Sequence, residues 1–158
     1  MISVALDGIF IHSVIEELKH TILNGRIDKV SQPEKDEIVL SIKNERKTYK
    51  LLISSSSVYP KIHFTKISKV NPMQPPMFCM VLRKHLNTAK LIKIHQLDTD
   101  RVVLLDFETT DELGFNSIYT LVIEIMGRHS NITLIRQRDN MIMDSIKHIT
   151  PEINSVRS

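Results

Sequence analysis

Two short polar segments interrupt the apolar stretches of this chain, and both carry side chains that could recognise a phosphate or a base. Gly127-Arg128-His129-Ser130-Asn131 lies between two runs rich in Ile, Val and Leu. Its Arg, His and Asn side chains could converge on a phosphate or a base edge, or the segment could be a plain hairpin loop in which Gly127 adopts a positive φ. Asp98-Thr99-Asp100-Arg101 places a carboxylate beside the planar donors of an arginine. That combination suits RNA edges and 2′-hydroxyls, although an Asp-rich turn is also common for structural reasons.

Other chemistries find little support in the residue pattern. Ser130 directly follows His129, and adjacent residues do not normally form the base–nucleophile hydrogen bond of a hydrolytic triad. Seven histidines are scattered without a His-Glu-x-x-His motif, and Cys79 is the only cysteine. The four glycines do not form a phosphate-binding loop of either nucleotide-binding type. We therefore expect no metal, no cofactor and no catalytic residue.

Charge is distributed unevenly along the chain, although the formal net charge is only +3. From Arg46 to Leu97 there are ten basic residues and no acidic one, whereas residues 98–127 hold seven acids and one arginine. If folding gathers the basic block on one face, the protein has a positive surface suited to nucleic acid. The alternative is that the two blocks lie on neighbouring strands and neutralise each other.

Apolar periodicity predicts two helices. The first has an apolar stripe at three- and four-residue steps, made by Ile11, Val14, Ile15, Leu18 and Ile22. Asp7 is its expected N-cap, and Asn24-Gly25 its expected end, with Gly25 in the left-handed conformation. The second helix is expected to begin at Pro75-Pro76 and to reach Leu86, with basic residues in its last turn.

The other apolar segments predict strands. They lie at about 38–42, 49–54, 62–64, 91–97, 101–107, 118–126, 131–136 and 141–146. A turn is expected at Asn44-Glu45. The short gaps between segments favour antiparallel hairpins, because parallel strands need long crossovers. We expect about eight or nine strands and two helices, an α+β fold built mainly on an antiparallel β-sandwich or barrel.

A length of 158 residues and an apolar fraction of 42% suit one domain with its own core. We expect that domain to span residues 1–150, with residues 151–158 beginning a linker to further modules. The sequence has no recognisable signal peptide and no apolar run near the roughly 20 residues that cross a membrane. A cytoplasmic protein without a membrane partner is the expected outcome.

Several segments, in order along nearly the whole chain, form a specific set. They are Leu6–Phe10, Gly25–Val30 with Gln32-Pro33, Pro75–Met80 with Leu82–Leu86, Asp100-Arg101, Glu124–Ile132 and Asp144–His148. This ordered set resembles the N-terminal domain of the NFACT family, which is often named fibronectin-binding protein A. Asn87-Thr88 departs from the pattern, because the family more often has glycines there.

The resemblance implies a tRNA-binding domain of a ribosome-associated quality-control protein. The full protein would bind large ribosomal subunits obstructed by peptidyl-tRNA and would use tRNA, mainly alanine tRNA, for template-free alanine tailing of stalled chains. The implied fold is similar to the N-terminal β-sandwich of formamidopyrimidine-type DNA glycosylases. The family's functional acid falls on Asp7, and its Asp-Arg motif falls on Asp100 and Arg101. The full predicted tRNA-binding set is Asp7, Arg26, Arg83, Lys84, Asp100, Arg101, Arg128, His129 and Asn131.

Two other functions are weighed against this one. A fibronectin-binding surface adhesin is suggested by the family's older name, but the chain lacks a signal peptide and an anchoring motif. A base-excision enzyme is suggested by the glycosylase likeness, but those enzymes use an N-terminal proline followed by an acid. This chain begins Met1-Ile2-Ser3, so we expect no enzymatic activity of that kind.

Overall fold

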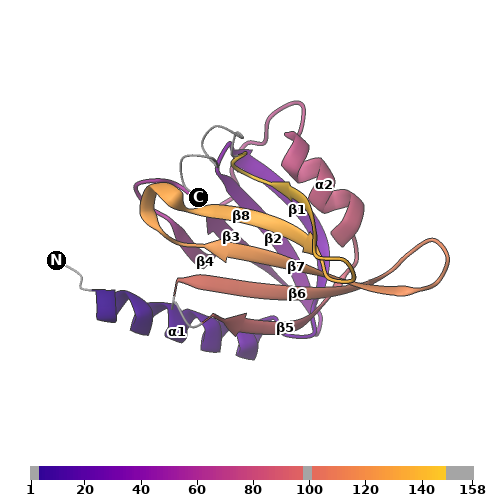
Figure 1. The fold of residues 1–158 in the computed structure, drawn as a ribbon, viewed down its shortest axis with the longest axis horizontal. Helices are drawn as coiled ribbons and strands as arrows, with labels where there is room; N and C mark the ends of the chain where they lie inside the picture. Colours follow the sequence, from indigo (N-terminus) through magenta and orange to yellow (C-terminus); the bar gives the residue numbers. More distant parts are fainter. Residues whose placement is uncertain (1–3, 98–100, 149–158) are drawn as a thin grey trace.

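The computed structural model describes the backbone of residues 4–97 and 101–148, and side chains from residue 11 onward. The described residues contain two α-helices, nine strands and one short 3-10 helix (Figure 1). In chain order these are α1 (Val4–Thr21), β1 (Arg26–Glu34), β2 (Glu37–Asn44), β3 (Lys47–Ser54), β4 (Lys61–Thr65), α2 (Met77–Leu86), β5 (Lys90–Gln96), β6 (Val102–Thr110), β7 (Asn116–Glu124), η1 (Gly127–His129), β8 (Asn131–Arg136) and β9 (Met141–Ser145). The predicted α+β class is confirmed.

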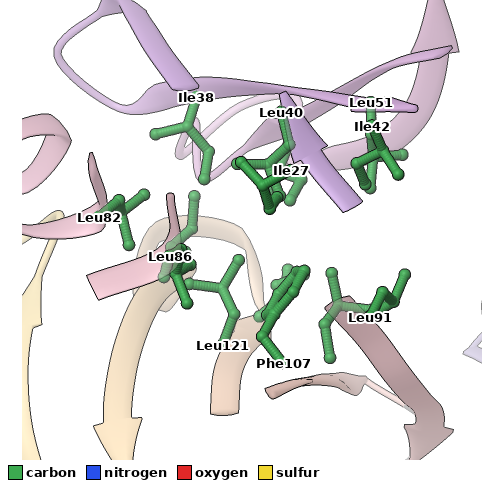
Figure 2. Close-up of a cluster of buried hydrophobic side chains, with 14 of the residues drawn as sticks. Ile27, Ile38, Leu40, Ile42, Leu51, Leu82, Leu86, Leu91, Phe107 and Leu121 are labelled. Atoms are coloured by element: carbon green, nitrogen blue, oxygen red, sulfur yellow. The ribbon is translucent and has the colours of Figure 1, made fainter. Parts of the chain in front are cut away.

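All neighbouring strands are antiparallel, in the order β4-β3-β2-β1-β5-β6-β7-β8-β9. β1 and β5 share only the pair Arg26–Lys90, so the sheet divides there into two halves. Figure 2 shows apolar side chains of the two halves facing each other, with Leu40 and Ile42 on one side and Phe107 on the other. The core therefore lies between the halves, as a sandwich requires.

The hairpins follow the predicted alternation, with small shifts at their turns. Ile38, Leu40 and Ile42 in β2 are fully buried and alternate with outward-facing residues. The turn to β3 uses Glu45 and Arg46, whose φ angles are +50° and +75°, rather than the expected Asn44-Glu45. Two successive positive φ angles match the twist of antiparallel strands, which explains this placement.

Two details of the first helix differ from the prediction. α1 begins at Val4, so Asp7 lies inside the helix and is not its N-cap. At the other end Asn24 takes the left-handed conformation, with φ +74°, and Gly25 does not. Gly25 is needed for close packing instead, because a Cβ there would lie 2.7 Å from Ile42 Cγ2 and 3.0 Å from the Ile22 carbonyl oxygen.

The second helix begins at Met77, directly after Pro76, as predicted. Phe78, Leu82 and Leu86 are buried, and the helix packs against β1. Strand β1 itself has no counterpart in the sequence prediction. Its register shifts at two places, between Ile27 and Lys29 and between Ser31 and Glu34, so its apolar residues do not alternate regularly.

Candidate functional site

Six of the nine predicted site residues lie at two opposite ends of the sheet. The start of β6, the end of β7 and the start of β8 meet at one end, where Val102 pairs with Glu124 and Glu124 with Asn131. We call this the Arg101 end. The starts of β1 and β5 meet the end of β6 at the opposite end, where Arg26 pairs with Lys90 and Lys90 with Glu108. We call this the Lys90 end.

Two loops present basic side chains at the Arg101 end. Arg101 is half-buried, and its carbonyl oxygen accepts a hydrogen bond from the Ile125 amide at 2.9 Å. The side chains of Arg128 and His129 are exposed within η1. Gly127 has φ +60°, as predicted for this turn. The structure therefore brings Arg101, Arg128 and His129 to the same end of adjacent strands.

Two hydrogen bonds of Ser130 fix the loop that carries Arg128. Its buried hydroxyl accepts a hydrogen bond from the Met126 amide at 2.9 Å, and its own amide donates to the Gly127 carbonyl at 3.0 Å. These bonds fix the backbone on both sides of Arg128. Ser130 thus positions the loop.

Asn131 is buried and serves the backbone. Its amide nitrogen donates to the Lys147 carbonyl at 3.1 Å, and its oxygen accepts from the Lys147 amide at 3.0 Å and the Ile132 amide at 2.9 Å. The carboxamide thereby ties the segment after β9 to the start of β8. A contribution of Asn131 to ligand binding would act through this arrangement of the two segments.

The side chains of the two predicted acidic site residues, Asp7 and Asp100, are not among those that the structure describes. Asp100 lies outside the described residues. Asp7 is described only as part of the α1 backbone. Their roles stay predictions.

Two further charged residues lie at the Arg101 end and were not in the predicted set. Glu124 is half-buried, and burial raises the pKa of its carboxyl. The Lys147 ammonium is buried and forms no hydrogen bond with a described residue. A buried charge without a partner is uncommon in proteins. Both residues fall within segments that carry the family resemblance, but their burial depends on strand pairing that the sequence does not reveal.

The Lys90 end collects a second set of basic residues. Arg26 and Lys84 line a pocket of about 340 Å³ together with His85 and Lys90. Arg26 donates through Nη1 to the Thr88 carbonyl oxygen at 3.1 Å. Arg83 lies elsewhere, because its Nε donates to the carbonyl oxygen of Val30 at 2.9 Å. The three predicted phosphate-attracting residues therefore do not share one surface with Arg101.

The basic and acidic blocks partly neutralise each other. β5 pairs with β6, which places Lys90 opposite Glu108 and Lys93 opposite Asp106. His95 Nε2 lies 3.6 Å from Asp106 Oδ2. Lys69 of the basic block pairs instead with Glu37, which precedes both blocks in the sequence, at 2.8 Å. The predicted alternative, in which the basic and acidic blocks lie on neighbouring strands and neutralise each other, therefore holds for β5 and β6. An excess of positive charge remains at the strand ends.

The described residues include neither a metal-binding cluster nor a membrane-spanning helix. No group of three or more His, Cys, Asp or Glu side chains among them is arranged to hold a metal ion. No helix in the described part of the chain is long and apolar enough to cross a membrane. The Arg101 end offers the guanidinium groups of Arg101 and Arg128, and the loop that carries Arg128 is fixed by Ser130. Such cationic donors suit an anionic ligand.

Comparison with known proteins decides the family. The family model described as NFACT N-terminal and middle domains matches residues 7–158. The chain belongs to the NFACT family. The NFACT relative named Rqc2 homolog RqcH, from Bacillus subtilis, is 40% identical over 154 residues, which cover 98% of this chain and 27% of that protein. The human ribosome quality control complex subunit NEMF is 27% identical over 147 residues, which cover 93% of this chain and 13% of that protein.

A solved structure supports the same assignment for this NFACT chain. The N-terminal domain of fibronectin-binding protein PavA from Streptococcus pneumoniae superposes with a TM-score of 0.88 at 41% identity, over 90% of this chain and 54% of that one. The present chain spans little more than a quarter of the length of the RqcH relative. Family membership and fold are therefore established for this chain.

Proposed function

We propose that this NFACT chain is a non-enzymatic tRNA-binding domain of a ribosome quality-control protein. The observation that carries the proposal is the Arg101 end, where Arg101, Arg128 and His129 lie at the same end of adjacent strands of one sheet. The name of the NEMF relative, a ribosome quality control complex subunit, supports the cellular process. The fixed loop backbone supports binding, because preorganised donors lose less entropy when they engage a ligand.

The whole protein, in this proposal, binds large ribosomal subunits obstructed by peptidyl-tRNA in the cytoplasm. This domain holds a tRNA, with alanine tRNA the expected species, for template-free alanine tailing of the stalled chain. Arg128 would contact phosphate, and Arg101 with Asp100 would read a polar edge of the RNA.

A tRNA titration with single variants tests the proposal. Arg101→Ala and Arg128→Ala should each weaken binding by about 5- to 100-fold at low salt, since each removes a charged contact of about 1–3 kcal/mol. Lys61→Ala is the control, because Lys61 is an exposed cation at the start of β4, in the other half of the sheet. Equal affinities for wild type and Arg101→Ala would contradict the assignment of the site.

A second candidate function rests on the name of the structural relative. PavA is described as a fibronectin-binding protein. If this domain binds fibronectin as its main role, the purified domain should capture fibronectin, and Arg101→Ala, Arg128→Ala and added tRNA should leave that binding unchanged. No capture by the purified, folded domain would remove this candidate.

A further inference from the structure

The pocket at the Lys90 end is formed by segments that are distant in sequence. It lies where the start of β1, the last turn of α2, the start of β5 and the end of β6 meet. Its lining includes Arg26, Lys84, His85, Thr88, Lys90 and Glu108. We propose that this pocket binds a phosphate group of the RNA backbone, as a contact separate from the Arg101 end. The inference rests on the proposed function for the source of the phosphate.

The charge of the pocket favours an anion. Arg26, Lys84 and Lys90 come from three different elements, and none lies within 4.0 Å of a carboxylate among the described residues. Glu108 is the one acid of the lining, and it lies opposite Lys90 across the strands. Three cations against one carboxylate leave an excess of positive charge, which a phosphate would neutralise.

The geometry fixes one of these cations in advance. Arg26 donates from Nη1 to the Thr88 carbonyl at 3.1 Å, so its guanidinium is held against the loop between α2 and β5. The guanidinium group is planar and rigid, so this one hydrogen bond also orients its other N–H groups. Their geometry matches that of phosphate oxygens. Thr109 and Asn87, whose side chains carry a hydroxyl and an amide, also line the pocket. They are neutral donors of the kind that accompany arginine and lysine at phosphates.

The pocket lies at the C-terminal end of α2, so the anion must be bound by side chains and not by the helix dipole. A helix C-terminus carries partial negative charge and repels anions. Lys84 and His85 lie in that turn and offset this charge. A phosphate in the pocket would therefore be held by Arg26, Lys84 and Lys90, and truncating the lysines should remove it.

The distance between the two ends points to folded RNA as the ligand. β6 runs from one end to the other over nine residues, and its eight steps of about 3.3 Å separate the ends by about 26 Å. A free phosphate would fill only one end. A tRNA is large enough to contact both ends at once.

Paired lysine variants test the pocket. The double variant Lys84→Gln/Lys90→Gln should weaken tRNA binding about 5- to 30-fold and lower the slope of log affinity against log salt by about one, the change expected for one phosphate contact. Lys61→Gln/Lys66→Gln is the control, because both lysines are exposed on or just after β4. It should keep the wild-type affinity and slope. Both double variants should stay folded in a thermal unfolding scan, with a slightly lower melting temperature for Lys84→Gln/Lys90→Gln, because Lys84 offsets the dipole of α2. Lys61→Gln/Lys66→Gln should match wild type, since these two lysines make no described ion pair.

A titration with inorganic phosphate identifies the ligand group. The His85 ring lines the pocket and contacts Tyr119 at a centroid distance of 5.0 Å, so its NMR resonances report on the site. Phosphate should shift them in wild type and not in Lys84→Gln/Lys90→Gln. Unchanged tRNA affinity and salt slope in the lysine variant would overturn the proposal, as would poly-glutamate shifting His85 while tRNA does not.

The outcomes also separate this inference from the proposed function. If Arg101→Ala binds tRNA normally but Lys84→Gln/Lys90→Gln does not, the site assigned at the Arg101 end fails and the pocket stands. If only Arg101→Ala loses affinity, the pocket is overturned and the proposed function stands. If wild type binds phosphate in the pocket but no tRNA, RNA is overturned as the source of the phosphate.

Discussion

Thr88 shows how one residue can depart from a family pattern and strain the backbone locally. Its φ is +61°, a left-handed conformation that is unfavourable for a β-branched residue and easy for glycine. The resemblance to the family implies glycines at 87–88, and a glycine at the second of these positions would adopt this conformation without strain. The loop keeps its shape because Arg26 donates to the Thr88 carbonyl oxygen.

Thr88→Gly should stabilise the domain. Removing the left-handed strain should raise the free energy of unfolding by about 1 kcal/mol, after the added entropy of glycine in the unfolded chain is subtracted. Urea denaturation measures this directly. Thr48→Gly, in hairpin strand β3, should have the opposite sign. A loss of stability in Thr88→Gly would contradict the strain argument.

His85 should make stability depend on pH. Burial of its ring, and then the charges of Lys84 and Arg136, lower the pKa of His85 in the folded state. The unfolded chain then binds the proton at a higher pH than the folded one. The free energy of unfolding should therefore fall as the pH drops from about 7 to about 5, through the ordinary histidine range.

The control for this prediction is His85→Gln, which cannot titrate. Chemical denaturation at several pH values should show a shallower decline for the variant than for wild type. Parallel curves for the two proteins would mean that the pKa of His85 is not lowered by folding.

Residue types predicted some site features, and spatial neighbours determined the rest. The turn at Gly127 and the position of Arg128 in a loop between strands follow from local sequence. The partner of Asn131 does not, because Lys147 lies sixteen residues further along the chain and meets it only through the pairing of β8 with β9. Long-range hydrogen bonds of this kind leave no periodic signal in the sequence.

Elements are held together at a few close approaches, and Gly25 is one of them. The residue joins α1 to β1, and a Cβ there would lie 2.7 Å from Ile42 Cγ2. Gly25→Ala should lower the free energy of unfolding by about 1–3 kcal/mol, as overpacking does in other cores. Gly114→Ala is the comparison variant for backbone strain alone. Gly114 has φ +85°, and a Cβ there would meet no atom within 4 Å, so overpacking does not contribute. Equal stability of Gly25→Ala and wild type would show that α1 and β2 can move apart at no cost.

The attachment of the segment after β9 depends on Asn131. Asn131→Ala should lower the free energy of unfolding by about 1–3 kcal/mol, because it leaves the half-buried amide and carbonyl of Lys147 without these partners. Hydrogen exchange of the Lys147 amide should become faster in the variant, while exchange in β2 changes only with global stability. Unchanged protection at Lys147 would contradict the role assigned to Asn131.

Elements with a regular pattern and clear ends were predictable. α2 follows Pro75-Pro76, and the hairpins from β5 to β9 are separated by short polar turns. β1 was missed because two bulges interrupt its alternation, and Pro33 lies near its end. The start of α1 was misplaced because a capping side chain at Asp7 was a weaker signal than the helix-forming residues before it.

At the scale of the whole molecule, folding sorts the charged blocks. Along the sequence the basic and acidic blocks are separate, but β5 and β6 place Lys93 opposite Asp106 within the sheet and Lys90 opposite Glu108 at the Lys90 end. An excess of positive charge is left at the two strand ends, about 26 Å apart along β6. Composition could not predict this arrangement, because the net charge of +3 is the same whether the blocks pair or separate.

The measurement that tests the Arg101 end most directly is a tRNA titration of wild type and Arg101→Ala/Arg128→Ala over a series of salt concentrations. We predict that wild-type affinity falls steeply with salt, and that the double variant binds at least about 10-fold more weakly with a slope lower by about one to two. Lys61→Ala, which removes an exposed cation at the start of β4, should match wild type in both quantities. A double variant with wild-type affinity and slope would contradict the claim that the Arg101 end binds tRNA.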